Sequence, residues 1–300
     1  MKKLRFLVSL TTRENDYQLE QAAAAQESSR RLGVDLEILY ADNDAITQST
    51  QILKAVQAAP EFRPDAIVFE PVGATSLAQV AHTAVGAGIC WAVLNREAEY
   101  LTELRKTSRV PIFSISSDHK EIGKIQGQQF AALLPRGGSI LYIQGPSENS
   151  AARDRTDGMH SALPSKIQVT ALRGQWTEES AHKSISSWLR LNLARKGGID
   201  LIGAQNDAMV MGARKAFEDI TKMEEREQWL RLPYTGVDGL PKTGQTWVRT
   251  GKLKATVIVP PNAGQAISMI AEAIKAGSGV SERSYTVPSS FPALEKLVRQ

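Results

Sequence analysis

The chain has 300 residues, 42% of them hydrophobic and 23% charged, which is typical of a soluble globular protein with room for two domains. Its formal charge of +4 is small for this length, and no run of basic residues is dense enough to predict nucleic-acid binding. No apolar run approaches the roughly 20 residues of a membrane-spanning helix.

The first ten residues have the basic start and the apolar character of a signal peptide, but Arg5 interrupts the apolar run and no small-residue cleavage site follows. We expect a first strand there. The protein is then either a mature, trimmed form or one that stays inside the cell.

Strands and helices alternate up to residue 94. Gly33 follows the first helix in the position that a left-handed C-cap needs. In the second helix, Ile46, Ile52, Leu53 and Val56 form an apolar stripe at helical spacing. The expected strands are 4–10, 34–40, 66–69 and 89–94; the expected helices are 17–32, 45–59 and 76–85, with a turn at 70–73.

A second series of the same kind follows a loop at 97–109 and a crossing through residues 111–118. It has helices at 120–134, 151–163 and 178–196, strands at 139–144, 168–172, 201–204 and 234–237, and a helix directly after the strand at 201–204. A strand at 255–259, a helix at 265–276 and a strand at 285–287 are too few for a third domain, so we expect them to complete the two sheets.

The sequence therefore predicts two similar Rossmann-like α/β lobes with parallel sheets, joined by a hinge of several segments. One lobe comprises residues 1–116 and 260–288, the other residues 117–259 and 289–300, with a ligand cleft between them. Such a hinge permits opening and closing.

Polar residues stand where several strands end. Asn206 and Asp207 follow one strand directly, at a position where ligands of open parallel sheets are bound. Asn and Asp are also ordinary N-caps, and for these two residues alone capping is the favoured interpretation.

Four motifs in order resemble the type I periplasmic sugar-binding proteins, the group that contains ribose-binding protein and shares its fold with the effector domains of LacI-type repressors. They lie at 150–155 (SAARDR, before a helix with Gly158), 204–207 (AQND, with Gly212), 236–239 (GVDG) and 251–256 (GKLKAT). The resemblance covers nearly all of the chain.

The resemblance implies a sugar held between two lobes by aromatic walls and by charged or amide groups. These groups suit hydroxyls, because Asp accepts hydrogen bonds, Arg donates them and Asn does both. Carried over by motif, the ligand-binding residues are Ser9, Tyr17, Asn95, Arg96, Arg155, Trp176, Asn206 and Asp238.

Three departures concern the ligand. Asn95 stands where these sugar binders usually carry Asp, Val259 stands where an amide is usual, and residues 14–17 replace a Pro-aromatic-aromatic segment. With fewer acceptors and Arg96 retained, a less hydroxylated, phosphorylated or acidic ligand is an alternative to a sugar.

The leading hypothesis is a monomeric solute receptor that closes on a small polar ligand and presents it to an ABC permease or a sensor protein. A ligand-sensing domain of a regulatory protein is the alternative, although no helix-turn-helix precedes Leu4. An enzyme is disfavoured, because no phosphate-binding loop or nucleophile motif is present and the four histidines form no short metal-ligand pair. We therefore expect no cofactor, no metal and no catalytic residue.

Overall fold

A computed structural model describes residues 3–72, 77–96, 98–192 and 198–297. The chain divides into two units, each assembled from two stretches. Unit 1 comprises Met1–Ser117 and Pro261–Thr286, and unit 2 comprises Asp118–Pro260 and Val287–Gln300. The chain therefore passes between the units three times.

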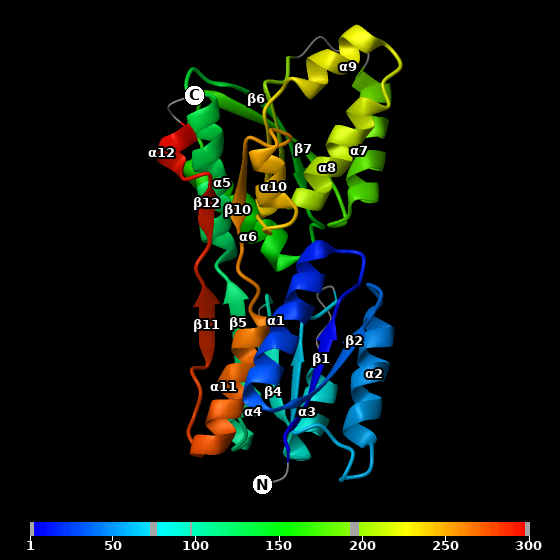
Figure 1. Ribbon diagram of the computed structural model, residues 1–300, viewed down its shortest axis with the longest axis vertical. Coiled ribbons are helices and arrows are strands. Elements are labelled where there is room, and N and C mark those ends of the chain that lie inside the picture. The colour runs from blue at the N-terminus through cyan, green and yellow to red at the C-terminus, as the bar shows by residue number, and fades with distance from the viewer. Residues whose placement is uncertain (1–2, 73–76, 97, 193–197, 298–300) are drawn as a thin grey trace. The chain divides into compact units, whose positions relative to one another are not determined.

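Unit 1 contains a sheet of six parallel strands in the order β11-β5-β4-β3-β1-β2 (Figure 1). The strands are β1 (Arg5–Leu10), β2 (Asp35–Tyr40), β3 (Ala66–Phe69), β4 (Cys90–Leu94), β5 (Ile112–Ser117) and β11 (Arg283–Thr286). The helices are α1 (Asp16–Leu32), α2 (Ala45–Gln57), α3 (Ala78–Gly86), α4 (Tyr100–Thr107) and α11 (Ala263–Ala276).

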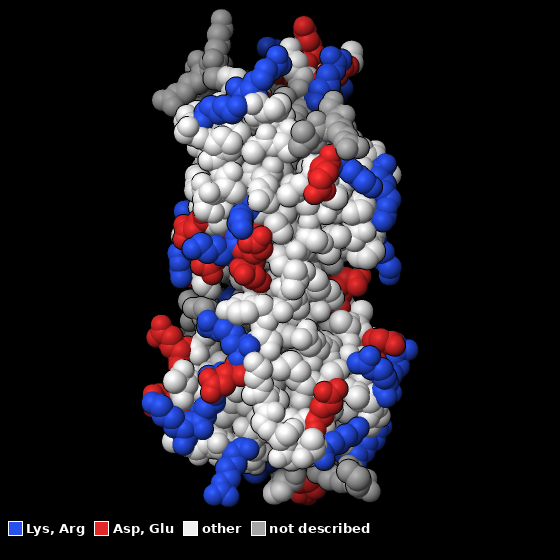
Figure 2. All heavy atoms as spheres, turned by 90° about the vertical axis from the view of Figure 1, so that its left-hand side faces the viewer, with Lys and Arg blue, Asp and Glu red and all other residues white. Residues whose placement is uncertain are grey.

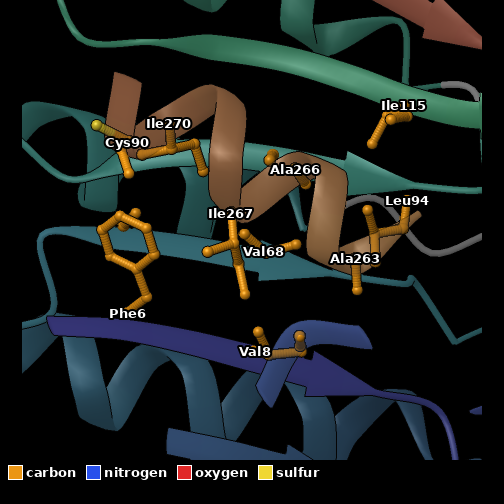
Figure 3. Close-up of a cluster of buried hydrophobic side chains, with 14 of the residues drawn as sticks. Phe6, Val8, Val68, Cys90, Leu94, Ile115, Ala263, Ala266, Ile267 and Ile270 are labelled. Carbon is orange, nitrogen blue, oxygen red and sulfur yellow. The ribbon is translucent and has the colours of Figure 1, made fainter. Parts of the chain in front are cut away.

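Both faces of this sheet are covered. On one face, Ile267 and Ile270 of α11 meet the strand residues Phe6, Val8 and Val68 (Figure 3). Helix α1 packs beside α11. On the other face, Trp91 and Phe69 pack against α2, α3 and α4, with their rings 4.8 Å apart. Burial on both faces explains why the inner strands β1, β3 and β4 are nearly continuous apolar runs.

Unit 2 contains a sheet in the order β12-β10-β9-β8-β6-β7, in which only β12 is antiparallel to its neighbour. The strands are β6 (Gly138–Gln144), β7 (Ile167–Arg173), β8 (Leu201–Ala204), β9 (Tyr234–Asp238), β10 (Ala255–Ile258) and β12 (Ser289–Phe291). The helices are α5 (His119–Leu133), α6 (Ser150–Ala162), α7 (Glu178–Asn192), α8 (Asp207–Glu218), α9 (Met223–Leu230), α10 (Gly244–Arg249) and α12 (Leu294–Leu297).

The core of unit 2 also has two sides. Helices α7 and α8 cover one face of the sheet, where the rings of Phe217 and Trp229 stack at 4.7 Å. Helices α5 and α6 cover the other face, around Phe130 and Tyr142. The predicted fold class, two α/β lobes with mostly parallel sheets, is confirmed.

Several local expectations are corrected. Residues 97–109 are not simply a loop, because the described part includes α4, and residues 112–117 form β5 within the first sheet instead of a crossing. Ile46 is 78% exposed and lies outside the apolar stripe of α2. The proposed helix start at Ser76, the end of the turn at Gly73 and the helix end at Lys196 lie outside the described residues.

On the face shown in Figure 2, Lys and Arg alternate with Asp and Glu, so neither sign of charge dominates it. Within the described ranges, no helix is long and apolar enough to span a membrane.

Candidate functional site

In each unit, buried polar side chains gather near the carboxyl ends of the parallel strands. Such ends are where open α/β sheets bind ligands. In unit 1, Ser9 lies near the end of β1, and Asn95 follows β4 directly. In unit 2, Asn206 lies just beyond the end of β8, and Asp238 is the last residue of β9.

A carboxylate that sequence analysis did not single out forms the centre of the unit 1 group. Glu70 follows β3, is 5% exposed, and accepts hydrogen bonds at Oε2 from Gln18 Nε2 (2.9 Å) and Asn95 Nδ2 (3.1 Å). Its Oε1 lies 3.6 Å from Nη2 of Arg96. We call Gln18, Glu70, Asn95 and Arg96 the unit 1 cluster.

Tyr17 and Ser9 border this cluster differently. The hydroxyl of Tyr17 lies 3.5 Å from Nδ2 of Asn95, so Tyr17 joins the cluster directly. The hydroxyl of Ser9 is completely buried and accepts from Nε2 of Gln48 at 3.2 Å; Gln48 also donates to the carbonyl of Glu70. The hydroxyl of Ser9 is therefore linked to the cluster through Gln48, while its backbone carbonyl accepts directly from the N–H of Glu70 at 3.0 Å.

The unit 2 cluster consists of Arg155, Trp176, Asn206 and Asp238. Arg155, which α6 carries, donates from Nη1 to the backbone carbonyl of Gln205, and the same nitrogen lies 4.0 Å from Oδ1 of Asp238. Its guanidinium lies 5.4 Å from the ring centroid of Trp176, a distance at which a cation and a ring attract. Nε of Arg155 is buried and has no hydrogen-bond partner among the described residues.

Asn206 has the capping role that its position predicts. Its Oδ1 accepts from the backbone N–H of Met209 at 2.8 Å, which caps α8. Its Nδ2 donates to the backbone carbonyl of Trp176 at 2.9 Å. Asn206 therefore fixes Trp176 within the unit 2 cluster in addition to capping the helix.

The backbone is unusual at these positions. Five non-glycine residues in the described ranges have positive φ, and three of them are candidate site residues: Asn95 (56°), Trp176 (65°) and Asp238 (106°). Non-glycine residues in this region are strained, and such strain concentrates at functional sites. The coincidence supports these strand ends as a binding site.

Asp207, next to Asn206, lies behind the unit 2 cluster. Its Oδ2 accepts from the backbone N–H of Gly239 at 2.9 Å, and its Oδ1 lies 2.8 Å from the hydroxyl of Thr256. Burial, and secondly the charge of Asp238, raise the pKa of Asp207 well above its usual value. Through its hydrogen bond with the N–H of Gly239, Asp207 fixes the turn that follows Asp238.

The charges within each cluster are balanced. Arg96 faces Glu70, and Arg155 lies near Asp238, so each guanidinium has a carboxylate beside it. Although Asn95 is itself uncharged, Glu70 supplies unit 1 with a charged acceptor from the end of the neighbouring strand. Its signal in the sequence was an acidic residue directly after an apolar strand, where sequence analysis predicted only a turn.

Within the described part of the chain, no group of three or more His, Cys, Asp or Glu side chains is arranged to hold a metal ion. What the two clusters offer is a set of hydrogen-bond donors and acceptors with an aromatic surface at Trp176. This combination suits the hydroxyl groups and the C–H faces of a small polar molecule.

Comparison with known proteins defines the class. Residues 6–278 match the periplasmic binding protein domain family. Because the match covers most of the 300 residues, the chain belongs to this family. The resemblance seen in the sequence is thereby confirmed, and the fold and clusters belong to a solute-binding protein.

Its relatives are named for small compounds that they bind. The ribose import binding protein of Salmonella typhimurium is 25% identical over 262 residues, which cover 87% of this chain and 81% of that protein. The D-apiose import binding protein of Paraburkholderia graminis is 23% identical over 270 residues, with coverage of 88% and 79%.

Solved structures share the fold. A galactofuranose binding protein superposes with a TM-score of 0.81 at 21% identity, covering 99% of this chain and 97% of that one. The periplasmic binding protein component of the arabinose ABC transporter from Shewanella sp. ANA-3, bound to L-arabinofuranose, also gives 0.81, at 20% identity and 98% and 93% coverage.

Proposed function

We propose that this protein is a receptor for a small, neutral, polyhydroxylated solute, a sugar or a sugar-like polyol, and that it delivers this solute to an ABC permease. The observation that carries the proposal is the pairing of one arginine with one carboxylate at the strand ends of each unit. The proposed ligand-binding residues are the unit 1 cluster with Tyr17 and Ser9, and the unit 2 cluster.

The balance of charge favours a neutral ligand. A hydroxyl group both donates and accepts, so it finds partners in a carboxylate and in a guanidinium. A phosphate or carboxylate has no hydrogens to offer Glu70 or Asp238 and is repelled by both. The phosphorylated or acidic alternative, which rested on a missing acceptor, loses its support once Glu70 is included.

Binding of one ligand to both clusters would give the ligand-bound receptor a conformation that differs from the ligand-free one. A ligand favours the arrangement of the protein in which it makes the most contacts. If one sugar contacts residues of both units, the ligand-bound state is the one in which both sets of contacts form together. This is the opening and closing that three chain passages permit.

The proposals on partner and location come from the relatives. The names of the two curated relatives describe import binding proteins, and one structural neighbour is the periplasmic component of an ABC transporter. We propose by analogy that this protein works outside the cytoplasmic membrane with an ABC permease.

Thermal unfolding with a panel of compounds tests the proposal. D-ribose, D-allose, L-arabinose, xylitol and myo-inositol represent neutral ligands, and ribose 5-phosphate is the anionic comparison. A ligand at a hundred times its Kd adds about 2.7 kcal/mol of stability. We expect at least one neutral compound to raise the Tm by several degrees. A shift with ribose 5-phosphate and with none of the neutral compounds would contradict the charge argument.

A second function, a ligand-sensing domain, has one specific observation in its favour. The fructose-binding periplasmic domain of a hybrid two-component system superposes with a TM-score of 0.78 at 21% identity over 99% of this chain. The same binding chemistry serves both functions, so the discriminating experiment is co-purification with a permease or with a sensor kinase.

A further inference from the structure

Beside each of the three passages of the chain between the units, a unit 1 residue within two positions of the passage belongs to one hydrogen-bond network. Ser117 is the last residue before the first passage, Asn262 is the second residue after the next one, and Thr286 is the last before the third. Ser117 and Asn262 both donate to Oδ1 of Asn95, from the backbone N–H at 3.4 Å and from Nδ2 at 2.7 Å. The hydroxyls of Ser117 and Thr286 lie 3.0 Å apart.

The partners of Asn95 determine the orientation of its amide. On the oxygen side are the two donors from the passage segments, and on the nitrogen side is the carboxylate of Glu70, 3.1 Å away. Turning the amide over would place its oxygen against a carboxylate and its nitrogen against two donors. The left-handed backbone of Asn95 further restricts where this side chain lies.

Asn262 is itself oriented by Gln21. Nε2 of Gln21 donates to Oδ1 of Asn262 at 2.8 Å, and Oε1 of Gln21 accepts the backbone N–H groups of Asn262 and Ala263 at 2.8 Å each. With its oxygen occupied by Gln21, Asn262 presents Nδ2 to Asn95. Both Gln21 and Asn262 are completely buried, and the hydrogen bonds from Gln21 through Asn262 and Asn95 to Glu70 form a continuous chain.

We propose that Asn95 connects the ligand-binding cluster of unit 1 to all three passage segments, and that Asn262 is the positioning residue that fixes its amide. The inference rests on the proposed function, because Glu70 and Asn95 are proposed ligand-binding residues. A ligand hydroxyl that competes for Glu70 or Asn95 changes the partners of the same amide that holds Ser117. Ligand binding at the cluster thereby changes the hydrogen bonds of the segments through which the chain leaves and enters unit 1.

Reversing the direction of the hydrogen bonds tests the network without any sugar. Asn262→Asp replaces the donor Nδ2 with an oxygen, so Asn95 faces an acceptor on both sides and one contact becomes repulsive. Adding Glu70→Gln supplies a donor on the opposite side, and Asn95 can then bridge the two with its amide turned over. Gln18 turns its amide as well, because its Nε2 would otherwise meet the new donor, and it gives up only its bond to the N–H of Thr11. We expect each single substitution to lower the Tm and the double variant to melt above Asn262→Asp.

Amide hydrogen exchange at Ser117 separates this role from a purely structural one. In the double variant, Oδ1 of Asn95 points toward position 70 and away from Ser117, whereas in Asn262→Asp alone the carboxylate of Glu70 keeps Nδ2 of Asn95 and leaves Oδ1 beside Ser117. We therefore expect the exchange of Ser117 to be about fivefold faster in the double variant, the factor that one ordinary hydrogen bond provides. The double variant melts above Asn262→Asp and yet exchanges faster at Ser117, whereas loss of packing alone would couple the two effects.

Two controls complete the experiment. In an Asn95→Gly background, which tolerates the left-handed backbone, the compensation between positions 262 and 70 should disappear. Asn149→Asp exchanges one good helix cap for another at a buried site in unit 2 and should leave Ser117 unchanged. Additive losses of Tm in the parent background, or Ser117 exchange in the double variant that equals the parent's, would overturn the proposal. Failure of every sugar to bind would count against the proposed function alone.

Discussion

Three buried carboxylates, Glu70, Asp207 and Asp238, set the electrostatics of the candidate site. Two of them lie beside arginines, whereas Asp207 accepts from a backbone N–H and lies beside a hydroxyl. Burial and the charge of Asp238 outweigh these partners and the more weakly acting charge of Arg155, so they favour the protonated form of Asp207. Asp207 therefore links the stability of unit 2 to pH.

The sign of this linkage follows from the raised pKa of Asp207 in the folded state. The folded protein binds the proton more tightly than the unfolded chain, so the associated stability is fully present below about pH 3.8. It decreases as the pH rises from there toward the raised pKa. Asp207→Asn, which resembles the protonated acid, should remove this decrease and gain stability relative to the parent as the pH rises.

Denaturant unfolding of the parent and Asp207→Asn proteins between pH 4 and 8 measures this effect. Asp207→Ala is the companion variant, because it also removes the acceptor for the N–H of Gly239 and should be destabilised at every pH. Parallel pH profiles for the parent and Asp207→Asn would show that Asp207 is ionised in the folded protein.

At this scale the sequence predicted which residues gather, but not all of their partners. The motifs identified Arg155, Trp176, Asn206 and Asp238, and the structure brings these four together. Glu70 was missed because sequence analysis assigned residues 70–73 to a turn and gave the carboxylate at its start no role. Contacts across 52 residues of sequence, such as Gln18 with Glu70, are set by strand order and cannot be read locally.

At the scale of elements, the site depends on how closely α5 and α6 approach. A Cβ added at Gly123 of α5 would lie 2.0 Å from the carbonyl oxygen of Arg155, and one added at Gly158 of α6 would lie 2.0 Å from that of Lys120. These glycines let the helix backbones touch at the residue that carries the guanidinium. The position of Arg155 is therefore a consequence of helix packing.

Gly123→Ala should displace α6 and cost about 1–3 kcal/mol of stability, the usual penalty of overpacking, and it should also weaken ligand binding. Gly86→Ala in α3 is the matched control, because its Cβ would meet nothing within 4 Å. There we expect a gain of about 0.4–1 kcal/mol from the reduced entropy of the unfolded chain. If denaturant unfolding gave the same change in the free energy of unfolding for both substitutions, the close contact between α5 and α6 would not restrict the residue at position 123.

Elements with a clear apolar pattern, either a continuous run or a regular spacing, were predicted well, and elements without such a pattern were not. The strands β1, β3 and β8 were predicted to within one residue at each end because both faces are buried and the runs are apolar. Helix α9 has no buried residue and β12 has only three residues, so neither produces a clear pattern. The segment at 112–117, predicted as part of a crossing, is the strand β5, and the first passage between the units follows it directly.

At the scale of the whole molecule, the two clusters lie in different units that the chain joins by three passages. Each cluster has its own carboxylate and its own guanidinium, so each is able to bind hydroxyl groups by itself. The central claim is that one solute uses both clusters. It distinguishes a receptor that closes on its ligand from a protein with two independent weak sites.

Calorimetric titration of the best neutral sugar from the panel into two variants, one per unit, tests this claim most directly. We expect Arg155→Ala to weaken binding by about 2–5 kcal/mol and Glu70→Gln by about 1.5–3 kcal/mol, with one sugar bound per parent chain. Arg153→Ala, an exposed neighbour on α6, should bind like the parent. Loss of affinity in only one of the two folded variants would contradict the account, because a single unit would then hold the sugar alone.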